Sequence, residues 1–141
     1  MNKQNLHTEI IALCDYASVS REGKLSINGI FDEFRPVNLP AAMARIFFVA
    51  SLVGSPDTSY SLNLKVEKDD NKELQGFPNL NIDVRTSLSG RNNIVLELVG
   101  LNFQHEGKYS FKIYNKKEEV GSTTLTVFRT VPNVTKDNKP N

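Results

Sequence analysis

The sequence predicts an all-β fold, an antiparallel β-sandwich of about eight short strands. Apolar and polar residues alternate along eight short runs, as expected for half-buried strands whose successive side chains point to opposite faces. Glycine, proline, asparagine or aspartate closes each run, where turns are expected. No run has the length and period of an amphipathic helix, so strands with short connections leave a sandwich or a barrel. Polar outer faces on several strands favour the sandwich.

The first expected strand, residues 9–19, is apolar on both faces. Such a strand is either covered on both faces or bends between two sheets. A turn at 21–24 with Gly23 joins it to a second strand at 25–32, so the two form a hairpin. Gly29 falls on the inward face of the second strand, which predicts a bulge or a close backbone contact.

Six further strands are expected after a proline-containing loop at 34–42, where Pro36 and Pro40 exclude a central strand. Their ranges are 45–53, 60–67, 80–87, 94–103, 108–115 and 120–128. The sixth strand, 94–103, carries Val95, Val99 and Leu101 on its second face. An apolar second face tends to be covered, which predicts self-association.

Composition limits the classes of function. A chain of 141 residues favours a single domain, expected at 9–131 between a polar segment at 1–8 and a disordered tail at 132–141. The formal net charge of +1 gives no bulk attraction to nucleic acid or to an anionic membrane. Residues 1–9 are polar and lack a signal-peptide core, and the apolar stretches are too short to cross a bilayer. We therefore expect a cytoplasmic protein.

A corner at 105–107 precedes Lys108-Tyr109-Ser110-Phe111. The pattern Gly-x-Tyr-x-Phe after a corner resembles the penultimate strand of immunoglobulin-like sandwiches, where a tyrosine hydroxyl pins the corner backbone. Tyr109 is the expected residue. The cysteine pair and the tryptophan of antibody domains are absent, because Cys14 is the only cysteine and there is no tryptophan. The sequence therefore predicts an immunoglobulin-like topology without a disulfide.

Two segments carry a further resemblance. Leu13-Cys14-Asp15-Tyr16-Ala17 is followed by a short turn, by residues 23–32 and then by a proline-containing loop and an apolar strand. This pattern, together with the Gly-x-Tyr-x-Phe corner, is similar to a family of small uncharacterised bacterial proteins over residues 10–127. The resemblance implies a bacterial β-sandwich domain. It implies no activity, so it identifies no catalytic residue.

Asp15 stands out as a carboxylate between apolar positions. A buried carboxylate needs hydrogen bonds or a cation, so we expect it to cap the hairpin turn or to accept backbone N–H groups. The alternative is a metal-binding domain or a metal-dependent hydrolase, in which Asp15, Asp32 and Glu33 hold a hard cation such as Ca²⁺. Their spacing matches no metal-loop motif, so the structural role is preferred and no metal or cofactor is expected.

No nucleophilic site is expected. His7 and His105 are the only histidines, and a Cys–His pair would need Cys14 beside one of them. That pairing fails if Cys14 faces the core, which is the usual place for a single cysteine in an apolar run. The chain has no zinc-ligand cluster, phosphate-binding loop or Gly-x-Ser-x-Gly motif.

We therefore expect a non-catalytic binding or structural module with a protein partner or self-association, and with no nucleic-acid or membrane contact. Such folds bind through end loops or by pairing an exposed edge strand. The loops at 34–42 and 69–79 are the first candidates, because each carries proline with exposed-looking apolar residues. Two alternatives to this binding module remain. One is the metal-dependent hydrolase, and the other is a cytoplasmic subunit of a larger assembly.

Overall fold

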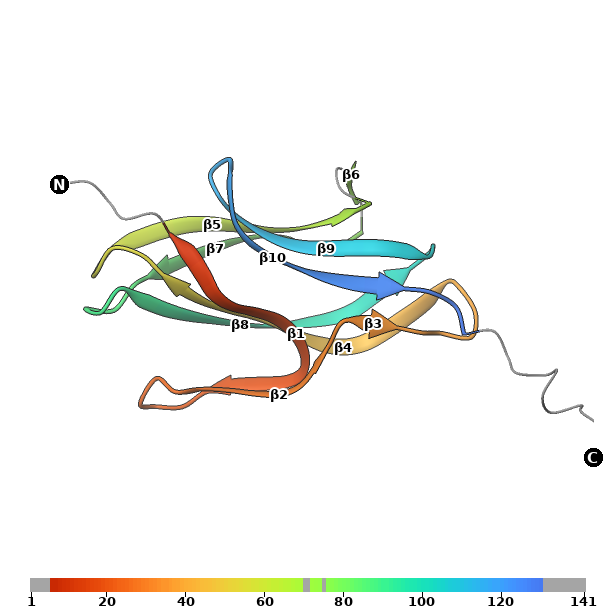
Figure 1. The fold of residues 1–141 in the computed structure, drawn as a ribbon, viewed down its shortest axis with the longest axis horizontal. Coiled ribbons are helices and arrows are strands. Elements are labelled where there is room, and N and C mark those ends of the chain that lie inside the picture. Colours follow the sequence, from red (N-terminus) through yellow and green to blue (C-terminus); the bar gives the residue numbers. More distant parts are fainter. Residues whose placement is uncertain (1–5, 70–71, 75, 131–141) are drawn as a thin grey trace, which may run out of the picture.

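The computed structural model describes residues 6–69, 72–74 and 76–130, and these residues form ten strands and no helix (Figure 1). The strands are β1 (His7–Val19), β2 (Leu25–Phe31), β3 (Glu33–Phe34), β4 (Ala41–Val53), β5 (Ser59–Lys68), β6 (Lys72–Glu73), β7 (Asn79–Arg85), β8 (Arg91–Phe103), β9 (Gly107–Asn115) and β10 (Glu118–Val127). The eight longer strands correspond to the eight predicted from the sequence. No helix of the described residues is long and apolar enough to cross a membrane.

The strands form two sheets with the order of an immunoglobulin-like sandwich. One sheet has the order β2-β1-β4-β8, and the other has the order β3-β10-β9-β5, with β6 and β7 both paired to β5. In immunoglobulin nomenclature β1, β4 and β8 take the places of strands A, B and E, while β10, β9, β5 and β7 take those of G, F, C and C′. The predicted fold is confirmed. Among the described pairings, only that of β3 with β10 is parallel.

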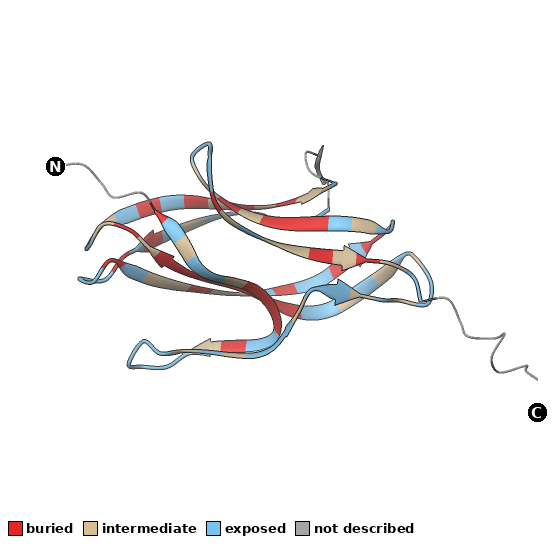
Figure 2. Cartoon of the chain, viewed as in Figure 1, coloured by how far each residue is buried: buried red, intermediate tan, exposed pale blue. Residues whose placement is uncertain are grey.

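The main core lies between the two sheets, and β1, β4, β5, β7, β8, β9 and β10 contribute buried residues to it (Figure 2). Phe48 of β4, Leu64 of β5 and Leu125 of β10 have no exposed surface. Phe111 is also fully buried and stands two residues after Tyr109, the position of the second cysteine in antibody domains. Apolar packing occupies the place that a disulfide takes in those domains.

The first strand serves two apolar clusters, as its two apolar faces predicted. Leu13 packs in the main core, whereas the neighbouring Cys14 packs in a second cluster on the outer side of its sheet. The buried members of this cluster are Cys14, Ala17, Phe47 and Val49, with Leu25, Ile27 and Val95 packed against them. The hairpin of β1 and β2 therefore covers part of the outer face of β4 and β8, and Val95 is covered within the chain.

The bend that allows this covering lies at Asp15 and Gly29. The register of β1 and β2 continues from Cys14–Ile30 to Tyr16–Asn28, which sets Asp15 opposite Gly29. Gly29 has a left-handed φ of 72°, and a Cβ atom added there would collide with the Asp15 carboxylate. The predicted close contact at Gly29 is confirmed, but Gly29 is exposed and so does not lie on an inward face as predicted.

Several predicted boundaries are wrong by a few residues. β1 begins at His7, two residues before the start of the predicted first strand. The loop at 34–42 is shorter than predicted, because Phe34 pairs within β3 and β4 already begins at Ala41. Alanine has a weak preference for strands, and pairing of 41–43 with 101–103 of β8 overrides it. The predicted tail at 132–141 lies outside the described residues.

The prediction that Leu101 lies on the outer face of its strand is also wrong. Leu101 is 3% exposed and belongs to the main core. Up to Leu98 the even-numbered residues of β8 face inward, but Leu101 and Phe103 do so after Gly100, which has a φ of 69°. The inward set of the paired strand β4 changes at the same level, between Met43 and Ile46, so both strands keep their contact with the core. Val99 is left exposed.

Candidate functional site

The three predicted carboxylates do not form a metal centre. Asp15, Asp32 and Glu33 are all exposed, and Glu33 forms an ion pair of 2.7 Å with Arg35. Among the described residues, no three histidine, cysteine, aspartate or glutamate side chains group closely enough to hold a metal ion.

The expected structural role of Asp15 is wrong as well. The bend in β1 turns its side chain to solvent, so the carboxylate needs no buried partner. The hairpin turn is closed instead by Ser20, whose Oγ accepts a hydrogen bond of 3.1 Å from the backbone nitrogen of Lys24.

Cys14 and the two histidines do not form a nucleophilic site. Cys14 is fully buried in the second cluster, and burial raises the pKa of its thiol. His7 and His105 are both exposed. A buried thiol with a raised pKa carries little thiolate, the reactive form, in agreement with the expectation of an inert cysteine.

Tyr109 forms the predicted tyrosine corner between β8 and β9. Its side chain is buried, and its Oη donates a hydrogen bond of 2.6 Å to the backbone oxygen of His105. Burial raises the pKa of the hydroxyl group. Phe103 meets the ring edge to face at 4.9 Å between centroids, and Phe77 stacks on it at 5.6 Å.

A small apolar pocket lies beside this corner, and we call it the corner pocket. Its volume is about 240 Å³. The described residues that line it are Lys68, Leu74, Gly76, Phe77, Asn102, Gln104, His105 and Tyr109. Leu74, Gly76 and Phe77 come from the loop at 69–79 that the sequence singled out.

A wider polar groove lies at the other end of β8, where the strand begins, and we call it the edge groove. Its volume is about 490 Å³. The described residues that line it are Val19, Glu22 and Gly23 from the hairpin, Arg85, Ser87 and Ser89 from the end of β7 and the following turn, and Arg91, Asn92 and Asn93 from β8. The Nδ2 of Asn93 donates to the backbone oxygen of Gly23 at 3.3 Å, which ties the hairpin tip to β8.

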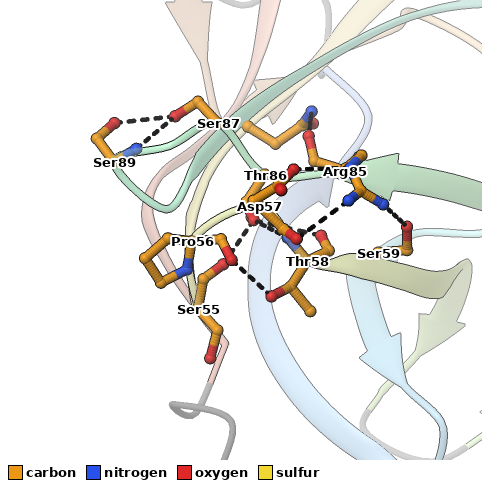
Figure 3. A network of polar contacts seen from close by, with 10 residues as sticks. Ser55, Pro56, Asp57, Thr58, Ser59, Arg85, Thr86, Ser87 and Ser89 are labelled. Atoms are coloured by element: carbon orange, nitrogen blue, oxygen red, sulfur yellow. Dashed lines mark hydrogen bonds and ion pairs between the residues drawn. The ribbon is translucent and has the colours of Figure 1, made fainter.

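Hydrogen bonds hold the β7 side of the edge groove in place (Figure 3). Thr86 is buried; its Oγ1 donates to the backbone oxygen of Ser55 at 2.5 Å and accepts from the backbone nitrogen of Thr58 at 2.9 Å. The guanidinium of Arg85 forms an ion pair of 2.9 Å with Asp57. These contacts join the β4–β5 turn to the end of β7 and the β7–β8 turn. Two loops of the chain therefore support this side of the edge groove.

The strand beside the edge groove has an open side. Within the described part of the chain, β8 pairs only with β4, so its other edge has no strand partner. At 13 residues β8 is the longest of the edge strands, since β2 and β7 have seven residues each. An edge strand presents unpaired N–H and C=O groups that another strand can pair with.

A polar network on the outer face of the second sheet belongs to the scaffold. Lys112 forms an ion pair of 3.0 Å with Glu67, and the Oη of Tyr114 donates to Glu67 at 2.7 Å. Burial alone would raise the pKa of Glu67, but the hydrogen bonds from Tyr114 and Lys112 outweigh it, so the pKa is lowered. The hydrogen bond to Glu67 raises the pKa of Lys112. Both groups thus hold their charged forms, as in a structural ion pair.

Sequence reasoning found part of these sites. The loop at 69–79 was named for its apolar residues, which line the corner pocket. The edge groove was missed, because it joins residues 22–23 to residues 85–93 and no local pattern links them. The one available signal was a run of polar residues around the turn at 87–93.

The comparisons with known proteins identify a family. The model of the family of unknown function DUF6941 matches residues 9–128. The search of curated proteins gives no match. Among solved structures, the chain is similar to an immunoglobulin-like protein from Pseudomonas aeruginosa, with 13% sequence identity and a TM-score of 0.42 over 88% of this chain and 97% of that chain.

Proposed function

The chain belongs to the family of unknown function DUF6941, and from its geometry we propose that it is a non-catalytic module that binds an extended segment of a partner protein. The observation that carries this proposal is the free edge of β8. An extended peptide adds to such an edge through main-chain hydrogen bonds, which supply affinity without a catalytic group.

The edge groove supports this mode of binding. Its lining comes from both sides of β8, with the hairpin tip on one side and the end of β7 on the other. The backbone oxygen of Arg91 already accepts from the backbone nitrogen of Ser87 at 2.8 Å. A segment that pairs along β8 from Asn93 to Val99 would therefore lie between two walls where it starts. Amide and hydroxyl groups line it at Ser87, Ser89, Asn92 and Asn93, and these groups both donate and accept hydrogen bonds.

Both arginines of the edge groove are paired within the chain. Arg85 pairs with Asp57, and Arg91 pairs with Glu9 at 2.6 Å. A charged partner therefore gains little from either arginine. We expect recognition to depend on the backbone of the bound segment more than on its contacts with these arginines.

The proposal includes a bacterial and cytoplasmic setting. The resemblance to bacterial proteins supports the first part. Cys14, a free thiol, is compatible with a reducing compartment, which supports the second.

The test compares partner capture by three forms of the full chain from a lysate of the native host. Val99 is 71% exposed on β8, and Val99→Lys places a charge on the free edge without emptying the core. Ile30→Lys is the matched control, because Ile30 is 65% exposed on β2, the opposite edge of the same sheet. Wild type and Ile30→Lys are expected to capture the same stoichiometric partner, and Val99→Lys is expected to lose it.

A partner that Val99→Lys retains at wild-type stoichiometry, with the variant folded, contradicts binding at this edge. For a captured partner, hydrogen exchange provides a second readout. The amides of β8 are expected to become protected in the complex, while those of β2 stay unchanged.

A further inference from the structure

We infer that the corner pocket is a binding site for a single neutral aromatic ring that carries a hydrogen-bonding group, such as a phenol or an indole. This site is separate from the edge groove. The two lie at opposite ends of β8, with Asn93 in the edge groove and Asn102 in the corner pocket. The inference therefore does not rest on the proposed function.

The size of the corner pocket fits one ring system. At about 240 Å³ it lies below the roughly 300–1,000 Å³ of sites that hold drug-sized ligands. Its apolar lining comes from Leu74, Phe77 and Tyr109, and no side chain stands at Gly76. Gly76 is exposed, and a Cβ atom added there would meet nothing within 4 Å apart from its chain neighbours.

Aromatic side chains already form a chain of contacts that reaches this pocket. Phe34 packs on Phe103 at 5.6 Å between centroids, and Phe103 contacts both Tyr109 and Phe77. Phe77 and Tyr109 both line the corner pocket. A bound ring would extend this chain with the edge-to-face and offset contacts that aromatic pairs prefer.

The hydroxyl of Tyr109 is not available to a ligand, because it donates to the backbone oxygen of His105. Polar contacts with a ligand are left to the side chains of Asn102, Gln104 and His105, all exposed beside the pocket. Primary amides donate and accept, so they suit a phenol hydroxyl or an indole N–H.

The charge at the mouth favours a neutral ligand. The ammonium group of Lys68 forms an ion pair of 2.6 Å with Asp69 and lies 5.9 Å from the centre of the Tyr109 ring. The charge of Lys68 is thus paired with a carboxylate of the same chain. A ring with a carboxylate would compete with Asp69 for Lys68, whereas a neutral ring would not.

The test titrates the full chain with indole, p-cresol and cyclohexanol, and follows backbone amide signals by NMR. Indole and p-cresol are expected to shift the signals of 102–105 saturably, with a dissociation constant on the order of 1 mM for so small a ligand. Cyclohexanol has a hydroxyl group and similar size but no aromatic face, and is expected to bind more weakly. The absence of saturable shifts at 102–105, or equal binding of cyclohexanol, would overturn the inference.

Two matched variants separate the ring contact from general stability. Phe77→Leu removes the aromatic ring beside the ligand and is expected to weaken indole binding by about 2- to 10-fold. Phe34→Leu makes the same change at the far end of the aromatic chain, outside the pocket lining, and is expected to leave binding unchanged. Equal weakening by both variants would contradict a ring site at Phe77.

Two further titrations distinguish the sources of the ring. N-acetyl-tyrosinamide presents a phenol as a protein side chain does, whereas p-cresol represents a free small molecule. Tighter binding of the amide assigns the site to a partner's side chain, and tighter binding of p-cresol assigns it to a free ligand. Either result supports the inference.

Discussion

The hydroxyl group of Tyr109 closes the β8–β9 corner from inside the protein. A phenylalanine at this position would keep the ring contacts with Phe103 and Phe77 but leave the backbone oxygen of His105 without this donor. We expect Tyr109→Phe to lower the free energy of unfolding by about 1–2 kcal/mol, measured by urea denaturation. Tyr16→Phe, at a ring that is 49% exposed, is the control and should change it by less than about 0.5 kcal/mol.

The carboxylate of Glu67 makes stability depend on pH. Its pKa is lower in the folded protein than the ordinary value of 4.5, because the hydrogen bonds from Tyr114 and Lys112 outweigh burial. A lowered folded-state pKa gives stability that is present above pH 4.5 and is lost as the pH falls toward the folded-state value.

We therefore expect Glu67→Gln to lose stability at neutral pH and to show a smaller further loss than wild type on acidification. Urea unfolding measured from about pH 7 down to about pH 3 checks this. Glu97→Gln is the control, because Glu97 is in an exposed ion pair with Arg45 and should keep the wild-type acid profile. Parallel acid profiles of Glu67→Gln and wild type would show that Glu67 does not contribute.

At the scale of the element, the second cluster holds the part of the β1–β2 hairpin beyond Asp15, whereas Leu13 and Phe31 at its base pack with the main core. Phe47 belongs to the second cluster and Phe48 to the main core, so adjacent residues of β4 report on different packing units. We expect Phe47→Ala to cost about 2–4 kcal/mol and to expose the amides of β2 to hydrogen exchange before those of β9.

Phe48→Ala is the matched comparison. Phe48 has no exposed surface in the main core, so its loss should reduce protection in both sheets together. If Phe47→Ala reduced the hydrogen-exchange protection of β2 and β9 equally, the hairpin would not unfold as a separate unit.

The elements that the sequence predicted well are those with regular alternation. Tyr60, Leu62, Leu64 and Val66 of β5 face the core as expected. The two-residue strand β3 was missed, because Glu33 and Phe34 are too few to alternate and proline follows at Pro36. The place of Leu101 was missed because Gly100 changes the inward set of β8, and a glycine in a sequence does not reveal its φ.

For the candidate sites too, features with a local sequence signal were predicted and features that depend on distant residues were missed. The apolar loop residues at Leu74 and Phe77 were visible as a local anomaly, so one wall of the corner pocket was predicted. The edge groove depends on how the hairpin folds over β4 and β8. That placement results from the bend at Asp15 and from the packing of Ala17 and Ile27, which involve residues distant in sequence.

At the scale of the whole molecule, the three predicted carboxylates do not gather into a metal site, which predicts how stability responds to metal ions. Since no metal-binding group of three occurs among the described residues, we expect millimolar Ca²⁺ or Mg²⁺ to leave the melting temperature unchanged. Differential scanning calorimetry with and without metal checks this. A rise in the melting temperature that Asp15→Asn abolishes would restore the metal-binding alternative.

The length of β8 sets the spacing between the two ends of the molecule. Nine positions separate Asn93 from Asn102, about 30 Å at the rise of an extended strand. One partner that offers a strand and, at this spacing, an aromatic side chain would occupy both ends at once. Its second contact would form at a high effective concentration, so two weak attachments would combine into a tight one. The length of β8 would then select partners by the distance between their strand segment and their aromatic side chain.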